Sequence, residues 1–405
     1  MTICFYRVFI FFIGFMFSIV LILTNSTFCF AGDVKGVTKN TIKIGSIADQ
    51  TGPVATVLQM VAKGHRNYFT HINNQGGING RKIKYILEDD HYQIPKTLAC
   101  FKKLMFKDEV FAFMGGGSTA AILLLKKKVK KLKTPYLSTA TGEAVVIPPE
   151  KYMFNLGVAY EDEIKVIFNY LINIIKVKNL RLGLVRPDTE HGKVGVRETE
   201  NQAKLYGINL MADEVLSVGA LEASSQVLGL KRRKINYVIL HHVTAAGSAF
   251  LRGCRKYRYL PKIIGTKWTC TDDIIRLSGK SIENYIGDAP YSSWYDDNPG
   301  CNEMRKITLK LYPGTEKPYR AKTYTMGWTD AYIVTEALRR SGKNLTKDGL
   351  IKAMESIKNF STNGLSGPIT YGPNDRKATD YCRMYKPDIK RGILVPITDW
   401  IRPVK

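Results

Sequence analysis

Two short segments of the chain place glycine and hydroxyl residues directly after apolar runs that predict β-strands. Gly115-Gly116-Gly117-Ser118 follows the run 110–114, and Thr139-Ala140-Thr141-Gly142 follows the run 135–138. Glycine lets the backbone approach a ligand closely, and hydroxyl groups together with helix N-terminal amides bind anions. The segments therefore predict a site for a small anionic group. The alternative is that Ser118 and Thr141 only cap the helices that follow them.

Three more polar segments follow predicted strands in the second half of the chain. They are Asp188-Thr189-Glu190-His191-Gly192, His241-His242-Val243-Thr244 and Lys267-Trp268. Carboxyl ends of parallel strands are where ligands bind, and the resemblance given below implies that these segments lie near the same ligand. The alternatives are a solvent-facing loop position for Lys267 and an ordinary hydrogen-bonded loop position for His191. Neighbouring residues at a strand end point in opposite directions, so His241 and His242 are not expected to form a metal site.

The elements that would position these residues alternate strand and helix. Residues 42–90 read as strand, turn, helix, glycine-rich turn and strand, which is typical of a β-α-β unit in a parallel sheet. The alternation continues to residue 138 and starts again with a helical pattern over 162–175. Two α/β lobes are therefore predicted. Asp89 and Asp90 end the second strand, where we expect them to accept local backbone hydrogen bonds rather than to act as a catalytic pair.

After residue 285 the alternation stops. The helical patterns at 303–311, 322–341 and 346–357 cannot form an α/β lobe alone, so we expect them to return to the first lobe. Strand-like segments at 369–371, 381–385 and 392–400 are then expected to recross to the second lobe. The predicted domains are a first lobe of residues 32–157 plus 291–374 and a second lobe of residues 158–290 plus 375–405. Multiple crossings of this kind form a hinge.

Residues 1–31 differ in composition from the rest. Arg7 is their only charged residue, and a long apolar run rich in Phe and Ile follows it. This pattern predicts a secretory signal peptide cleaved after Ala31, and hence an exported, periplasmic protein. The alternatives are a permanent membrane anchor and a lipid attached to Cys29.

The whole chain carries 60 Lys and Arg against 35 Asp and Glu, a net charge of +25. The cations are spread along the sequence, and the densest run, 126–133, lies on a helical pattern that predicts a solvated helix face. Together with export, this distribution argues against a nucleic-acid partner. Attraction to anionic ligands or to an anionic membrane surface stays open.

Catalytic motifs are missing from the sequence. There is no Gly-x-Ser-x-Gly elbow and no His-Glu-x-x-His pair. Ser278-Gly279-Lys280-Ser281 resembles the end of a phosphate-binding loop, but Ile274 stands where that loop needs its first glycine. The five cysteines after residue 31 include no Cys-x-x-Cys pair, so zinc binding has no support. We therefore expect neither catalysis nor a cofactor.

Several motifs together resemble the branched-chain-amino-acid type of periplasmic binding protein, which captures ligands for ABC importers. The most specific is Asn73-Asn74-Gln75-Gly76-Gly77-Ile78-Asn79-Gly80-Arg81-Lys82 followed by Glu88-Asp89-Asp90, with support from Thr51-Gly52-Pro53 and Trp328-Thr329-Asp330-Ala331-Tyr332. The resemblance covers nearly all of the chain after residue 31. It implies two Rossmann-like lobes with parallel sheets joined by a three-segment hinge, the type I periplasmic-binding-protein fold. It also implies closure on a small ligand and membrane permease subunits as partners.

In this family a serine after the third strand and a threonine after the fourth hold the ligand carboxylate. These positions fall on Ser118 and Thr141, with Thr139 and Ala140 beside them offering backbone groups. The acid that holds the ligand's amino group in the family would stand where this chain has Lys267. A lysine cannot accept a hydrogen bond from an ammonium group, so the chain departs from the amino-acid pattern here.

We therefore expect a small organic anion without an ammonium group, with branched-chain or related amino acids as the alternative. Lys267 and His191 would help to hold its carboxylate, while Trp268 and Tyr324 would stack on its apolar or aromatic body. The residues expected at the ligand are Ser118, Thr139, Ala140, Thr141, His191, Thr244, Lys267, Trp268 and Tyr324. The alternative function is a ligand-sensing module of a receptor, or an amide-type regulator.

Overall fold

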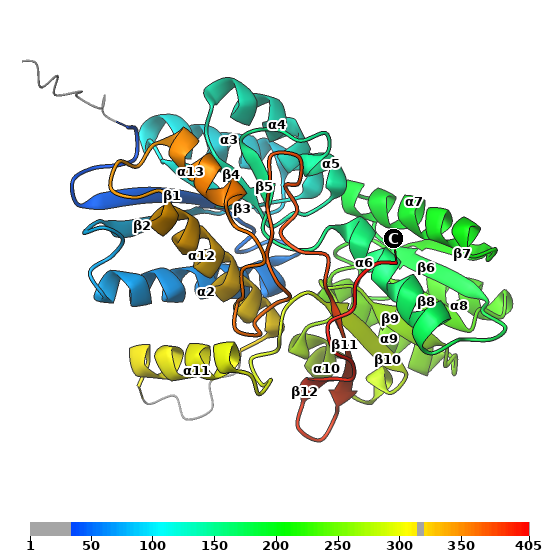
Figure 1. The fold of residues 1–405 in the computed structure, drawn as a ribbon. Helices are drawn as coiled ribbons and strands as arrows, with labels where there is room; N and C mark the ends of the chain where they lie inside the picture. Colours follow the sequence, from blue (N-terminus) through cyan, green and yellow to red (C-terminus); the bar gives the residue numbers. More distant parts are fainter. Residues whose placement is uncertain (1–33, 314–319, 405) are drawn as a thin grey trace, which may run out of the picture. The chain divides into compact units, whose positions relative to one another are not determined.

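Two β-sheets flanked by helices make up the part of the chain that is described (Figure 1). A computed structural model describes residues 34–313 and 320–404, and from Lys35 onward these belong to one unit. The predicted signal peptide lies outside the described residues. Within the described part, no helix combines the length and apolar character needed to cross a bilayer.

The first sheet has five parallel strands in the order β2-β1-β3-β4-β5. Its strands are β1 (Thr41–Ile47), β2 (Lys82–Glu88), β3 (Ala112–Gly115), β4 (Tyr136–Ser138) and β5 (Met153–Asn155). Every residue of β3, β4 and β5 is buried, as expected of parallel strands that are covered on both faces. The helices between these strands are α2 (Ala55–Asn74), α3 (Ile94–Lys102) with η1 (Lys103–Lys107), α4 (Thr119–Leu132) and α5 (Glu143–Val146).

The late helices pack on this first sheet's layer, as the sequence predicts. They are α11 (Pro299–Leu311), α12 (Lys322–Arg340) and α13 (Lys347–Glu355). α12 crosses α2 closely, because each helix presents a glycine at the contact. A Cβ atom on Gly64 would lie 2.4 Å from the carbonyl oxygen of Tyr324, and one on Gly327 would lie 2.0 Å from that of Val61. We call this sheet with its helices lobe I.

The second sheet has seven strands in the order β12-β11-β10-β9-β8-β6-β7, and with its helices it forms lobe II. Its strands are β6 (Leu182–Arg186), β7 (Leu210–Val215), β8 (Tyr237–Leu240), β9 (Lys262–Gly265), β10 (Tyr285–Ala289), β11 (Arg383–Asp388) and β12 (Ile393–Pro396). The pairs β10–β11 and β11–β12 are antiparallel, and the other described pairs of this sheet are parallel. Its helices are α6 (Tyr160–Phe168) with η2 (Asn169–Ile174), α7 (Glu190–Leu205), α8 (Ser224–Arg232), α9 (Thr244–Lys256) and α10 (Asp272–Ser278) with η3 (Gly279–Ile282).

Some elements differ from the prediction. β5, β10 and α10 were not expected, because each is short and their sequences have no clear periodicity. The strand predicted at 369–371 is wrong: Ile369 makes only an isolated bridge with Phe360. β10 contains Gly287 and Asp288, which disfavour a strand, and it forms one because β9 and β11 pair with it on both sides.

The chain passes between the lobes three times, from β5 to α6, from β10 to α11 and from α13 to β11. An ion network joins the third passage to the elements that flank the first: Lys377 Nζ lies 2.7 Å from Asp162 and 3.2 Å from Glu143. In addition, the Tyr371 hydroxyl donates to the carbonyl oxygen of Asn155. The domain boundaries given above stay a prediction, but the three passages are the segments that a hinge would use.

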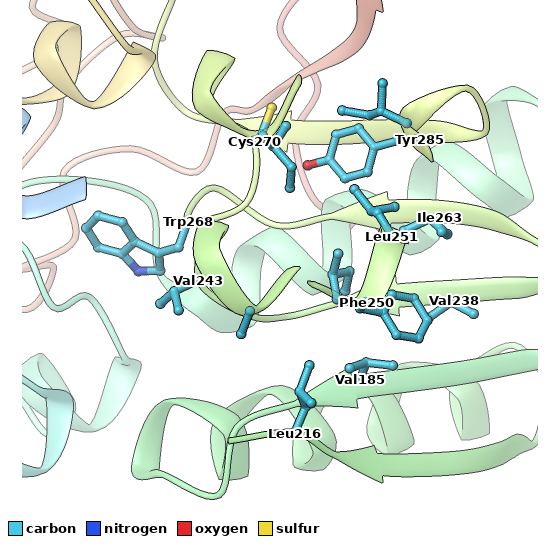
Figure 2. Packing of buried hydrophobic residues seen from close by; sticks show 14 of the residues in the cluster. Val185, Leu216, Val238, Val243, Phe250, Leu251, Ile263, Trp268, Cys270 and Tyr285 are labelled. Atoms are coloured by element: carbon cyan, nitrogen blue, oxygen red, sulfur yellow. The ribbon is translucent and has the colours of Figure 1, made fainter. Parts of the chain in front are cut away.

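The core of lobe II reaches the edge of its sheet where the loops lie. Figure 2 shows Val238, Phe250 and Ile263 in the body of this cluster, with Val243 and Trp268 at its end. The same cluster continues to Val57 and Leu58 of α2 in lobe I. The two lobes thus share apolar contacts at the loop edge of both sheets.

Candidate ligand-binding cleft

A small cavity of about 40 Å³ lies where the strand-end loops of the two lobes meet. Most of its lining is apolar or aromatic, and the polar part consists of two threonines and one histidine. The lining residues are Val54, Val57, Leu58, Tyr92, Gly116, Gly117, Thr119, Thr139, Ala140, Tyr160, His191, Val243 and Trp268. None of these carries a full charge in its ordinary state at neutral pH. A mostly apolar and aromatic lining with a few polar groups is typical of sites that bind small organic molecules.

The glycine segment after β3 forms one wall in the way that its sequence predicts. Gly115 has a positive φ of 89°, and a Cβ atom on Gly117 would lie 2.1 Å from Asp90 Oδ2. Asp90 itself is held by the Thr97 hydroxyl at 2.7 Å and by the Tyr92 amide at 3.1 Å, as expected for a structural carboxylate. Glycine is therefore required here because Asp90 occupies the space that a side chain would need.

Ser118 is the N-cap of α4, and its hydroxyl accepts from the amide of Ala121 at 3.3 Å. It does not line the main cavity, whereas Thr119, the next residue, does. The first amides of a helix lack intrahelical partners, and the helix dipole favours negative charge beside them. The N-terminus of α4 therefore has the kind of groups that bind anions, with Thr119 at the wall of the main cavity and both Ser118 and Thr119 at the wall of a second, adjoining one.

Thr139 and Ala140 line the cavity as expected, but Thr141 lies behind them. Its hydroxyl donates to the carbonyl oxygen of Val158 at 2.6 Å and accepts from Lys267 Nζ. Thr141 is completely buried. Its polar atoms are thus committed to other protein groups, and the structure does not bring its side chain to the cavity.

Lys267 occupies neither of its two predicted positions. It is only 5% exposed, so the solvent-facing alternative is wrong. Its ammonium group donates to Thr141 Oγ1 and to the carbonyl oxygen of Val158 at 2.9 Å, and it lies 4.4 Å from the ring centre of Tyr160. Because protein oxygens and an aromatic face surround it, the ammonium group joins lobe II to lobe I instead of facing the cavity.

His191 lies at the cavity wall, stacked on His241 with ring centres 3.9 Å apart. Tyr160 meets the His191 ring edge-on at 4.6 Å. Burial and then the neighbouring His241 lower the pKa of His191 well below its usual value, so its imidazole is neutral. Its Nε2 atom is buried without a protein hydrogen-bond partner, and a ligand group in the cavity could satisfy it.

Two other predicted residues lie away from the cavity. Thr244 donates its hydroxyl proton to the carbonyl oxygen of Trp268 at 2.7 Å, so it positions that ring rather than facing the ligand space. Tyr324 is fully buried in lobe I, with Asn67 and Thr308 as hydrogen-bond partners. The prediction that Tyr324 stacks on a ligand is not supported by this position, because α12 turns that side chain toward α2 and α11.

Several lining residues were missed by the sequence prediction. Val54, Val57 and Leu58 follow the turn after β1, and Tyr92 follows the Asp89–Asp90 pair after β2. Both segments lie beyond the carboxyl ends of parallel strands, where ligands are expected, so the strand-end rule is the signal that points to them. No sequence pattern indicated that Tyr160 lines the cavity, because this residue begins a helix directly after a passage between the lobes.

A second cavity adjoins the first and shares Tyr92, Thr119 and His191 with it. Its volume is about 580 Å³, and its wall includes Ile94, Ser118 and Val218. Asp188 and Glu190 also line this second cavity.

A buried acid pair lies behind the wall on the lobe II side. Neither carboxylate oxygen of Glu163 makes a hydrogen bond of ordinary geometry, and Lys267 Nζ lies 3.9 Å from one of them. Burial raises the pKa of Glu163 to about 7, against the opposing effect of the Lys267 ammonium group. Burial, followed by the charge of Glu163, also raises the pKa of Asp288. These acids are not lining residues, so they are not available to hold a ligand ammonium group.

Metal binding has no structural support in the described ranges, where no group of three or more His, Cys, Asp or Glu residues is suitably placed. The imidazole of His242 instead bonds the carbonyl oxygen of Leu216 at 2.9 Å, and that of His241 bonds the carbonyl oxygen of His191 at 3.1 Å. The two rings serve different partners, in line with the strand-end argument made from the sequence.

With two lobes, three passages between them and a shared cleft in place, the comparisons with known proteins are decisive. The sequence pattern of the family described as periplasmic binding protein matches residues 41–392. The chain belongs to the periplasmic binding protein family. This membership and the two mostly parallel sheets confirm the predicted fold class.

Individual relatives are distant. The Leu/Ile/Val-binding protein of Escherichia coli K12 is 20% identical over 82% of this chain and 86% of its own length. A branched-chain amino acid ABC transporter protein of Thermus thermophilus with bound valine gives a TM-score of 0.82 at 18% identity, covering 90% of this chain and 97% of that one. A fatty acid ABC transporter substrate-binding protein of Thermomonospora curvata also gives 0.82, at 22% identity and with 92% and 95% coverage.

Proposed function

We propose that this protein is the extracytoplasmic solute-binding component of an ABC importer. In this proposal it binds a small organic acid with an apolar body, does no chemistry on it, and passes it to membrane permease subunits. Membership of the periplasmic binding protein family and the predicted leader support this role. One structural relative is named for a branched-chain amino acid and the other for a fatty acid, and the proposed ligand has features of both: a small size and a carboxylate on an apolar body.

The observation that carries the ligand class is the absence of any Asp, Glu, Lys or Arg among the described residues that line the main cavity. A zwitterionic amino acid would leave its ammonium group without a charged partner, and an unpaired buried charge is costly. A carboxylate, in contrast, would meet the α4 N-terminus together with the hydroxyl groups of Thr119 and Thr139. Trp268, Tyr160 and the α2 side chains would contact the apolar body.

The sharpest test compares two ligands that differ only in the amino group. Isothermal calorimetry with leucine and with 4-methylpentanoate, which shares its carbon skeleton, measures what the ammonium group contributes. We expect 4-methylpentanoate to bind at least tenfold more tightly, and Thr139→Val to weaken it by about 1–3 kcal/mol through the unpaired carboxylate. Thr329→Val is the matched control, because Thr329 is also buried, its hydroxyl group donates to the carbonyl oxygen of Thr325 within α12, and it lines neither cavity. Tighter binding of leucine would refute the organic-acid assignment and return the amino-acid alternative.

A further inference from the structure

Lobe II exposes several large aliphatic side chains at the edge of its sheet. Leu205 at the end of α7 is 72% exposed, Met211 on β7 is 40% exposed, and Ile174 and Ile175 at the end of η2 are 47% and 44% exposed. β7 is the terminal strand of the seven-stranded sheet, so no further strand covers it. These residues lie in two segments that are far apart in sequence.

Side-chain contacts join the two segments into one surface. Asn173 donates from its side-chain amide to the Tyr206 hydroxyl at 3.2 Å, which ties η2 to the end of α7. Partly buried aliphatic residues from both segments line a concavity that also includes Met211; they are Ile172, Val177, Leu180 and Ile208. We call this surface, formed by residues 172–180 and 204–211, the η2–β7 surface.

The charge on the η2–β7 surface has one sign. The segments 169–181 and 200–211 contain four cations, Lys176, Lys178, Arg181 and Lys204, and a single acid, Glu200. Lys176, Lys178 and Lys204 are exposed, and no carboxylate of the described residues lies within ion-pair distance of them. The acids that follow on β7 are already paired: Asp213 with Arg186 at 2.7 Å and Glu214 with Arg233 at 3.1 Å.

Exposed aliphatic side chains beside unpaired lysines are the combination that a lipid interface recognises. The aliphatic groups can enter the boundary between headgroups and acyl chains, while lysines contact anionic headgroups. A small soluble anion would use the lysines but leave the aliphatic residues exposed, and exposed apolar patches of this kind mark interaction sites. The net charge of +25 adds a long-range attraction to any anionic bilayer.

We propose that the η2–β7 surface docks the protein on an anionic membrane surface. The proposal rests on the extracytoplasmic location proposed above, because only there would the surface face a bilayer during transport. It does not depend on the identity of the ligand, since the η2–β7 surface and the cleft share no lining residue among those described. Docking would hold the protein near its membrane partners between delivery events.

The test measures co-sedimentation of the exported protein with phosphatidylglycerol vesicles and with phosphatidylcholine vesicles. The surface variants are Leu205→Glu and Lys204→Glu. Their matched controls are Leu260→Glu, because Leu260 is also 72% exposed, and Lys127→Glu on the exposed face of α4. All variants keep the same N-terminal segment, so its own contribution to vesicle binding cancels in the comparison.

We expect the wild type to bind phosphatidylglycerol vesicles and not phosphatidylcholine vesicles. Each surface variant should bind at least about fivefold more weakly, the effect expected for one charge near a bilayer, whereas the controls keep most of the affinity. Equal losses in controls and surface variants, or no preference for the anionic vesicles, would overturn the proposal. Calorimetry with 4-methylpentanoate on the same samples separates the two proposals, because failure there leaves the vesicle result intact.

Discussion

Lys267 and His191 show how far single residues can be interpreted from sequence. Both residues follow strand ends and both lie near the cleft, but only His191 lines the main cavity. Lys267 is longer, and its ammonium group passes behind the wall to the carbonyl oxygen of Val158. A strand-end position thus predicts the neighbourhood of a side chain, while the direction of a long side chain depends on oxygens supplied by a distant part of the chain.

Glu163 gives a pH-dependent prediction at the same scale. Its folded-state pKa is raised to about 7 by burial, so between its usual value of 4.5 and pH 7 the folded state keeps a proton that the unfolded state loses. Stability contributed by the protonated acid is therefore lost as pH rises through this window. Glutamine cannot ionise, so Glu163→Gln should gain roughly 1–2 kcal/mol over the wild type for each pH unit within it.

Urea unfolding at pH 4.5, 6 and 8 would measure this difference. Burial lowers the pKa of His241 to about 3 and that of His242 to about 4, so their contribution is lost as pH falls below 6.5. Both proteins share these histidines, and comparison of the two therefore isolates Glu163. Glu283→Gln is the control, because its side chain is 62% exposed. A constant gap between Glu163→Gln and the wild type across this range would contradict the shift.

At the scale of elements, the contact between α2 and α12 depends on two glycines. Alanine at Gly64 would place its Cβ atom 2.4 Å from the carbonyl oxygen of Tyr324, so the helices must separate. We expect Gly64→Ala to lower the free energy of unfolding by roughly 1–3 kcal/mol, despite the better helix propensity of alanine. The control is Gly219→Ala, since nothing lies within 4 Å of a Cβ atom there. Denaturant unfolding that ranks the two variants equally would show that α12 does not need this close approach.

The sequence predicted elements with strong periodicity well and short elements poorly. The sequence predicts strands at 210–215, 237–240 and 262–265, and β7, β8 and β9 have these bounds. β10 was missed because Gly287 and Asp288 interrupt the apolar pattern, and pairing with both neighbours overrides that weak propensity. In the main cavity, Thr139, Ala140, His191 and Trp268 were predicted from strand-end loops, while Tyr160 reaches the wall because it follows a passage between the lobes.

At the scale of the whole molecule, polar contacts in the cleft region couple the lobes even before a ligand is considered. The Lys267 ammonium group in lobe II donates to Thr141 in lobe I and to Val158 at the first passage. The apolar cluster that includes Trp268 and Leu58 also spans both lobes. A ligand can promote closure only by binding the closed arrangement more tightly than the open one. The stronger these contacts between the lobes are, the less of the ligand's binding free energy is needed to close them.

This coupling predicts what happens when the Lys267 contact is removed. Lys267→Met is made together with Glu163→Gln, so that no buried charge is left unpaired. Hydrogen bonds to charged groups contribute about 1.5–3 kcal/mol, so the ratio of closed to open molecules without ligand should fall by roughly one to two orders of magnitude. Small-angle scattering should then give a larger radius of gyration for the double variant than for Glu163→Gln alone. Saturating 4-methylpentanoate or leucine should reduce the difference, because a bound ligand favours closure. Lys193→Met on the exposed face of α7 is the control. The double variant could instead have the same radius of gyration as Glu163→Gln while circular dichroism shows that it is folded. In that case the Lys267 contact would not favour the closed arrangement of the lobes.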